Sequence, residues 1–73
     1  MTIDIDTSIS YMVKDLEPKE YYILRRDLRE TDKDKLIYRI YQRGPTPYKA
    51  TTYFGTPVLS LPSERCYKVK LRD

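Results

Sequence analysis

The fold is decided by Leu36-Ile37-Tyr38-Arg39-Ile40-Tyr41-Gln42-Arg43, a stretch rich in β-branched and aromatic residues. Such residues favour strands. With a period of two, one face of the strand carries Leu36, Tyr38 and Ile40, and the other carries Ile37, Arg39, Tyr41 and Arg43. The next residues, Gly44-Pro45-Thr46-Pro47, cannot lie in the middle of a sheet. The stretch therefore predicts a strand that ends in a turn.

Residues 21–28 precede this strand and allow two interpretations. Tyr21, Leu24 and Leu28 have helical spacing, and residues 15–18 resemble a helix start, so one helix within 15–28 would make the fold α+β. The same residues also alternate with a period of two. Because the polar run 29–35 reads as a loop between two such segments, we favour a hairpin of 21–28 with 36–43.

The remaining sequence predicts further strands. Residues 3–13 alternate apolar with polar side chains, and three later segments read as strands at 48–54, 58–61 and 65–71. We therefore expect a single domain over 1–73 that is mainly β, with a small antiparallel sheet curling into a barrel or sandwich. The expected core is Ile3, Ile5, Ile9, Tyr11, Val13, Leu24, Leu36, Tyr38, Ile40, Phe54, Leu59, Tyr67, Val69 and Leu71.

The composition argues against catalysis. The chain has no histidine, one cysteine and two glycines, so it lacks an imidazole base, the usual zinc ligand sets and a glycine-rich phosphate loop. We expect no enzyme activity, no metal and no cofactor. No apolar run approaches 18 residues, and no apolar leader is visible, so we expect a cytoplasmic protein without a membrane segment. A core of this size supplies only about 3–5 kcal/mol of stability, so we expect further stability from dimerisation or from a partner, and the chain to be a monomer or a homodimer.

Charge is distributed unevenly along the chain. Residues 1–35 carry seven basic and nine acidic side chains, whereas residues 36–73 carry seven basic and two acidic ones. The second half is therefore basic by five charges, and the ordinary interpretation is a solvated surface. The functional interpretation is a basic face presented to an acidic partner.

Cations and tyrosines alternate on the predicted strand faces. Arg39, Tyr41 and Arg43 share the exposed face of the central strand. If the last strand lies in the same sheet, Lys68, Lys70 and Arg72 are expected to join that face, with Arg25 and Lys49 near its margins. These six residues, Arg39, Tyr41, Arg43, Lys68, Lys70 and Arg72, are the candidate partner-binding residues.

Such a face suits two classes of partner. Single-stranded nucleic acid would place phosphates on the cations and stack bases on tyrosine, as on small β-barrels. A protein partner would use Tyr and Arg as interface anchors, or would add a strand to an edge such as 58–61. Cross-strand Tyr–Arg pairs that only stabilise the sheet are a third interpretation.

The chain also resembles a class of viral proteins. The resemblance rests on its length, its start at Met1-Thr2-Ile3, its single Cys66 and its Tyr/Arg-rich β segments. In these features it is similar to small phage-encoded host-takeover proteins, among them regulators that bind bacterial RNA polymerase. The resemblance implies a non-catalytic regulator or inhibitor that binds this polymerase in the host cytoplasm and modulates transcription. It carries over no binding residue.

Overall fold

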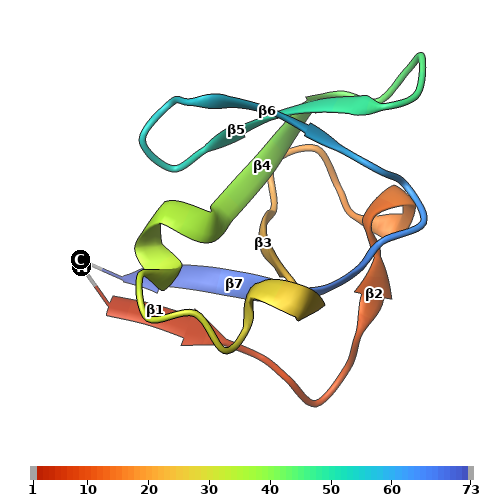
Figure 1. Ribbon diagram of the computed structural model, residues 1–73. Helices are drawn as coiled ribbons and strands as arrows, with labels where there is room; N and C mark the ends of the chain where they lie inside the picture. Colours follow the sequence, from red (N-terminus) through yellow and green to blue (C-terminus); the bar gives the residue numbers. More distant parts are fainter. Residues whose placement is uncertain (1, 73) are drawn as a thin grey trace.

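The computed structural model describes residues 2–72, which form one antiparallel sheet of seven strands (Figure 1). The strands are β1 (Thr2–Ile5), β2 (Tyr11–Met12), β3 (Tyr21–Leu24), β4 (Ile37–Gln42), β5 (Tyr48–Thr52), β6 (Pro57–Ser60) and β7 (Arg65–Arg72). They lie in the order β1-β7-β3-β4-β5-β6, and β2 also pairs with β7. In Figure 1, β4 crosses from the level of β1 and β7 to that of β5 and β6.

The prediction of a mainly β, antiparallel fold is confirmed, as is the hairpin between 21–28 and 36–43, which forms as β3 and β4. The expected closure into a barrel or sandwich is not found, because β1 and β6 lie at opposite ends of the strand order. The chain after β6 instead forms backbone hydrogen bonds with residues 13 and 14. Val13 N–H donates to Glu64 O (3.0 Å), and Lys14 N–H donates to Pro62 O (3.1 Å). The turn after β6 is thus held by residues 13 and 14, away from β1.

The alternative helix within 15–28 is wrong. That segment contains β3 between two three-residue 3-10 turns, η1 (Val13–Asp15) and η2 (Arg25–Asp27). A third such turn, η3 (Lys33–Leu36), precedes β4, and residues 2–72 contain no α-helix. Pro18 interrupts any helix there, and β3 pairs with both β4 and β7, so strand pairing satisfies its backbone on both sides. No helix in this part of the chain is long and apolar enough to cross a membrane.

The predicted strand at 3–13 is broken into β1 and β2. The carboxylate of Asp6 accepts hydrogen bonds from both Ser8 N–H and the Ser8 hydroxyl, which closes a local turn. These bonds lower the pKa of Asp6. Both strands still pair with β7, which reaches Ile5 at Val69 and Tyr11 at Cys66. A side-chain turn therefore interrupts the strand without changing its neighbour.

An inner cluster fills the concave side of the sheet. The sheet supplies its floor, and η1 with the following residue supplies Val13 and Leu16, both fully buried. Its buried members are Val13, Leu16, Tyr22, Leu24, Ile40, Ala50 and Cys66. The Cys66 thiol donates to Tyr11 O at 3.5 Å. A peripheral turn thus completes the core that the short strands cannot fill alone.

An outer cluster lies on the opposite face of β3, β4 and β7. Ile23, Ile37 and Val69 are its buried members, and side chains from β1 and η3 pack against them. Both faces of β3 are therefore buried, as in a central strand. Of the expected core, Val13, Leu24, Ile40 and Val69 are buried, whereas Ile9, Phe54 and Leu59 are exposed. The other expected core residues, Ile3, Ile5, Tyr11, Leu36, Tyr38, Tyr67 and Leu71, are partly buried.

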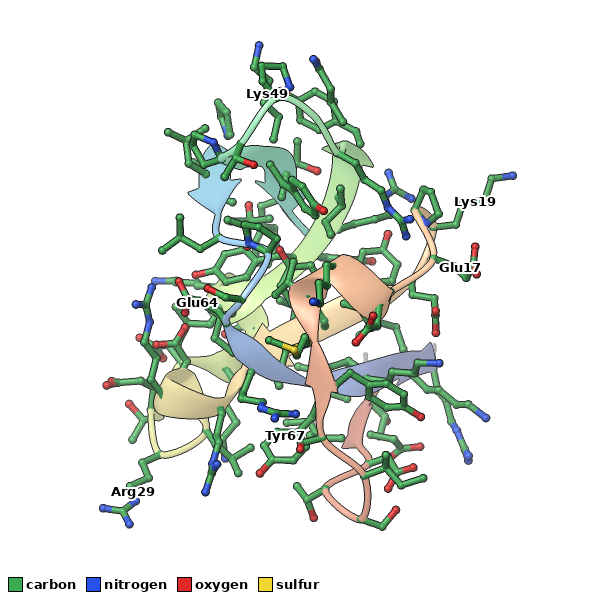
Figure 2. All side chains as sticks on the ribbon, turned by 90° about the vertical axis from the view of Figure 1, so that its right-hand side faces the viewer. Glu17, Lys19, Arg29, Lys49, Glu64 and Tyr67 are labelled. Carbon is green, nitrogen blue, oxygen red and sulfur yellow. The ribbon has the colours of Figure 1, made fainter. Side chains whose placement is uncertain are left out.

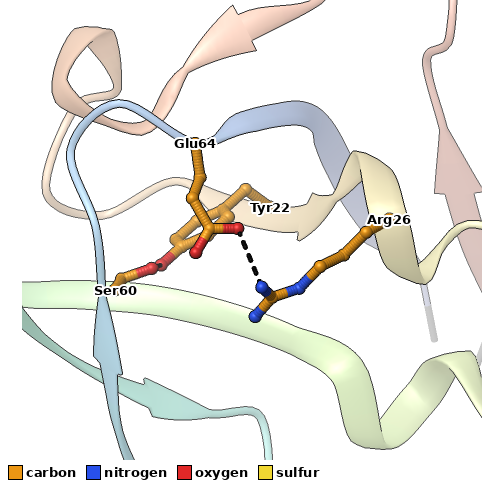
Figure 3. Close-up of polar contacts among 4 residues, drawn as sticks. All are labelled: Tyr22, Arg26, Ser60 and Glu64. Carbon is orange, nitrogen blue, oxygen red and sulfur yellow. Dashed lines mark hydrogen bonds and ion pairs between the residues drawn. The ribbon is translucent and has the colours of Figure 1, made fainter.

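A buried hydrogen bond joins two strands that are not neighbours in the sheet (Figure 3). The Tyr22 hydroxyl of β3 lies 2.6 Å from the Ser60 hydroxyl of β6, with β4 and β5 between them in the strand order. Both residues are almost fully buried. Desolvation raises the pKa of Tyr22 to about 12, so the phenol stays protonated at neutral pH. This bond holds β6 over the concave side of the sheet.

We predict that Tyr22→Phe lowers the free energy of unfolding by about 1–2 kcal/mol, because the buried Ser60 hydroxyl loses its partner. Urea denaturation measures the change. Adding Ser60→Ala to Tyr22→Phe should cost less than the sum of the two single changes, because both polar groups are then gone. The exposed Tyr41→Phe is the control and should be neutral. Additive effects of the two single changes would contradict the role of the bond.

We also predict that stability falls as the pH rises from 9 to 12. Burial raises the pKa of the Cys66 thiol from 9.0 to about 11 and that of Tyr22 from 10.0 to about 12. In this range the unfolded chain has lost protons that the folded chain keeps, so the free energy of unfolding decreases as the pH rises. Urea midpoints measured between pH 8 and 11.5 test this. Tyr22→Phe should flatten the slope above pH 10, whereas the exposed Tyr41→Phe should leave it unchanged.

Candidate functional site

The outward surface of β4, β5 and β6 holds the exposed residues of the predicted face. In the register, Arg39 lies opposite Thr51, and Lys49 lies opposite Leu59. We call Arg39, Tyr41, Lys49 and Leu59 the β4–β6 outer face. Lys49 lies at the top of the molecule in Figure 2. The three strands therefore bring residues from a 21-residue span of sequence onto one surface.

A β-bulge places Tyr41 on this surface. Ile40 pairs with Ala50, but the next registered pair is Gln42 with Lys49, which leaves Tyr41 as the extra residue on β4. A bulge bends the strand and re-aims its side chains. Tyr41 thus lines, together with Lys49, Pro57, Val58 and Leu59, a shallow hollow of about 300 Å³.

Exposed apolar side chains concentrate on the same three strands and their turns. Within residues 2–72, six large hydrophobic residues are exposed, and all but Ile9 fall between residues 41 and 61: Tyr41, Tyr53, Phe54, Leu59 and Leu61. Leu59 is 70% exposed and Tyr41 58%. Single exposed hydrophobic residues are normal, but a concentration on one part of a small domain is typical of an interaction surface.

Arg39 is held in place by an aromatic row. Its guanidinium carbon lies 5.3 Å from the centre of the Tyr21 ring, within the range of a cation–π contact. Tyr21 in turn packs on Tyr53 (6.0 Å between ring centres), and Tyr53 meets Phe54 edge to face (5.4 Å). The predicted cross-strand Tyr–Arg pairing is therefore observed at this position. The contact places the Arg39 guanidinium beside the Tyr21 ring.

Strand β6 has a free edge. Its described neighbour is β5, on one side. Thr52 N–H donates to Thr56 O at 2.9 Å, and bonded and non-bonded pairs alternate along an antiparallel ladder. Since Thr52 and Thr56 are a bonded pair, every second residue of β6 after Thr56 also bonds to β5. The N–H and C=O groups of Val58 and Ser60 therefore face β5, whereas those of Leu59 face outward. The exposed side chain of Leu59 thus accompanies an unpaired backbone donor and acceptor.

The second predicted group, Lys68, Lys70 and Arg72, does not join this face. In the register, Val69 lies beside Tyr21 and Tyr21 beside Arg39, so Val69 shares the face of Arg39 and the two lysines point to the other side. The expectation of one shared face is therefore wrong, because the register of β7 differs by one residue from the one it requires. Arg43 is exposed in the 43–47 connection that follows β4.

Two of the three cations on β7 form ion pairs with carboxylates. Lys68 Nζ lies 3.1 Å from Glu20 Oε2 and 4.5 Å from the centre of the Tyr11 ring, and the bond to Glu20 raises its pKa. Arg72 Nε lies 2.9 Å from Asp4 Oδ2, and Lys70 is opposite Asp4 in the register. Asp6 also feels the charge of Lys70. Lys68 and Arg72 are thus engaged by carboxylates, and Lys70 lies near Asp4 and Asp6.

The β4–β6 outer face is charged differently. Residues 36–63 contain Arg39, Arg43 and Lys49 and no aspartate or glutamate. Its positive charge is therefore not offset by any carboxylate of the same strands and turns.

No group of three or more Cys, Asp or Glu side chains within residues 2–72 is arranged to hold a metal ion. The Cys66 thiol is fully buried, and its raised pKa keeps it protonated. The arrangement on the β4–β6 outer face can bind, through apolar contact, positive charge and a free strand edge.

No family model, curated protein or solved structure matches the chain.

Sequence reasoning placed Leu59 in the core, whereas its side chain is exposed. A Leu in a short alternating segment normally faces a core, and the sequence holds no signal for which side of an edge strand is covered. The free edge itself was foreseen for residues 58–61. Lys49 was expected only at the margin of the predicted face, because its position beside Tyr41 depends on the bulge in β4.

Proposed function

We propose that this protein is a non-catalytic regulator that binds a larger protein by adding an extended segment of it to β6. One observation carries the proposal: the free edge at Leu59 lies beside an exposed apolar hollow and uncompensated positive charge. An extended segment can pair with an exposed edge while alternate side chains enter adjacent pockets. A segment that combines acidic and apolar residues complements this surface.

The proposed partner is bacterial RNA polymerase in the host cytoplasm, and the proposed outcome is a change in transcription. The support for this partner is the resemblance to small phage host-takeover proteins. Tyr and Arg at the centre of the surface are the residue types most often found as interface anchors. A pre-positioned Arg39 loses little conformational freedom on binding, which favours affinity.

A nucleic-acid strand is less well accommodated on this face. The Tyr21 ring that would stack a base is already in contact with Arg39 and Tyr53. On β7, Lys68 is likewise engaged by Glu20 and the Tyr11 ring. A salt titration separates the two partners, since strand binding weakens with a log–log slope of about −0.7 per phosphate contacted.

Immobilised protein should capture a single bacterial complex containing RNA polymerase subunits from lysate, because an extended protein segment can pair with the free edge at Leu59. The experiment is run with and without nuclease, at low and moderate salt. Capture that survives nuclease supports the proposal and identifies the partner. Loss of all bound material on nuclease treatment would refute a protein partner on this face.

Leu59→Pro should abolish this capture while leaving the fold intact, because proline removes the outward N–H but not a bond to β5. Leu59→Thr keeps the N–H and separates the backbone contribution from that of the side chain. Arg39→Glu should weaken binding by about 2 kcal/mol, roughly thirtyfold. Lys70→Glu is the charge-matched control on the opposite face. Equal losses for Arg39→Glu and Lys70→Glu, measured by titration calorimetry with the captured complex, would remove this face from the interface.

A further inference from the structure

Four arginines surround a second hollow, at the other end of the molecule from the β4–β6 outer face. Its volume is about 600 Å³, and it lies between η2 with the following turn and the start of β7. The charged and aromatic residues that line it are Arg25, Arg26, Arg29, Arg65, Glu64 and Tyr67. In Figure 2, Arg29 and Tyr67 lie toward the bottom, far from Lys49 at the top.

The hollow carries excess positive charge. Glu64 is its one lining carboxylate, so four positive charges and one negative charge leave an excess of three. Glu64 Oε2 lies 3.5 Å from Arg26 Nη1 (Figure 3). Within residues 2–72, the side chains of Arg25, Arg29 and Arg65 form no ion pair. Like charges around one concavity repel each other and focus a positive potential there, which an anion would relieve.

The backbone keeps these arginines close together. Leu28 N–H donates to Arg25 O (3.3 Å), and Glu30 N–H donates to Asp27 O (3.1 Å), so residues 25–30 form successive tight turns. Asp27, the acidic residue of η2, is not among the residues that line the hollow. The turns thus bring Arg25, Arg26 and Arg29 to one wall of the hollow.

The hollow also has an apolar wall. Tyr67 is half-buried against the outer cluster, and Leu28 lies beside the arginines. An aromatic ring next to guanidinium groups can stack a base while the guanidinium groups bind phosphate oxygens, in bidentate fashion where geometry allows. A volume of this size lies within the range of small-ligand sites.

We infer that this arginine-lined hollow binds a nucleotide unit, with phosphate on Arg25, Arg29 and Arg65 and the base against Tyr67. The unit can belong to a single strand or to a free nucleotide, since the recognised chemistry is the same. An acidic peptide would satisfy the cations but would leave the ring and the apolar wall without a planar partner. The inference does not depend on the β4–β6 outer face.

The test is fluorescence anisotropy with the full chain and a labelled ten-residue oligothymidylate at 50 mM salt. Adenosine 5′-monophosphate, inorganic phosphate and hexaglutamate serve as competitors. Arg25→Gln and Arg29→Gln remove exposed charges, and each should weaken binding about five- to tenfold. Lys19→Gln is the charge-matched control, because Lys19 is exposed and lies far from Arg29 in Figure 2; it should change affinity less than twofold. Affinity should fall with salt at a slope of about −0.7 per phosphate.

Specific loss in the two arginine variants, with Lys19→Gln unaffected, supports the inference. Displacement by adenosine 5′-monophosphate at concentrations where inorganic phosphate fails supports a free nucleotide as the source, and failure of both supports a strand. Three outcomes would overturn it: no binding at millimolar protein, equal losses in all three variants, or tighter binding of hexaglutamate than of the oligonucleotide. Tyr67→Phe keeps the ring and should bind like the unmodified chain, so a large loss there also contradicts stacking.

Discussion

The hydrogen bond between Tyr22 and Ser60 is the constraint on which the shape of this small sheet depends. It connects β3 to β6 across the concave side, although two strands lie between them in the sheet. With β6 held over the inner cluster, Val13 and Leu16 need only fill the remaining opening. The outward side of β4, β5 and β6 is left without a covering layer, and this is the surface that can meet a partner. A polar pair in the core thus determines which face of the sheet stays exposed.

Register, more than composition, determines what each charged residue contacts. Arg39 and Lys68 lie on neighbouring parts of one sheet, yet one faces outward beside an exposed apolar hollow and the other meets Glu20 and Tyr11. A one-residue offset in pairing reverses the face of every side chain on a strand. The same effect explains why Lys70 and Arg72, which look like part of a basic stripe in the sequence, are balanced by acidic residues of the N-terminal strand.

Much of the strand layout follows from period-two patterning, and the remainder depends on contacts that no local pattern contains. The strands at 37–42, 48–52, 57–60 and 65–72 were foreseen to within about two residues, because turns rich in Pro and Gly separate them. The interruption of the first strand after Ile5 was not foreseen, because it comes from hydrogen bonds between the Asp6 side chain and Ser8. Leu16, Tyr22 and Cys66 were missed as core residues, since their burial requires η1, β6 and β7 to meet. The arginine-lined hollow was missed for the same reason, as Arg65 reaches Arg25 only through the fold.

Pro57 also bears on how this protein behaves at high concentration. It begins the free edge strand and has no N–H, so the outward side of β6 offers a single backbone donor, that of Leu59. Edge strands with long rows of free donors recruit copies of themselves and grow into fibrils. An edge this short can receive one brief segment but gives a growing stack too few contacts to extend. The missing N–H of Pro57 therefore limits self-assembly along this edge and leaves the Leu59 donor and acceptor as its one free pair.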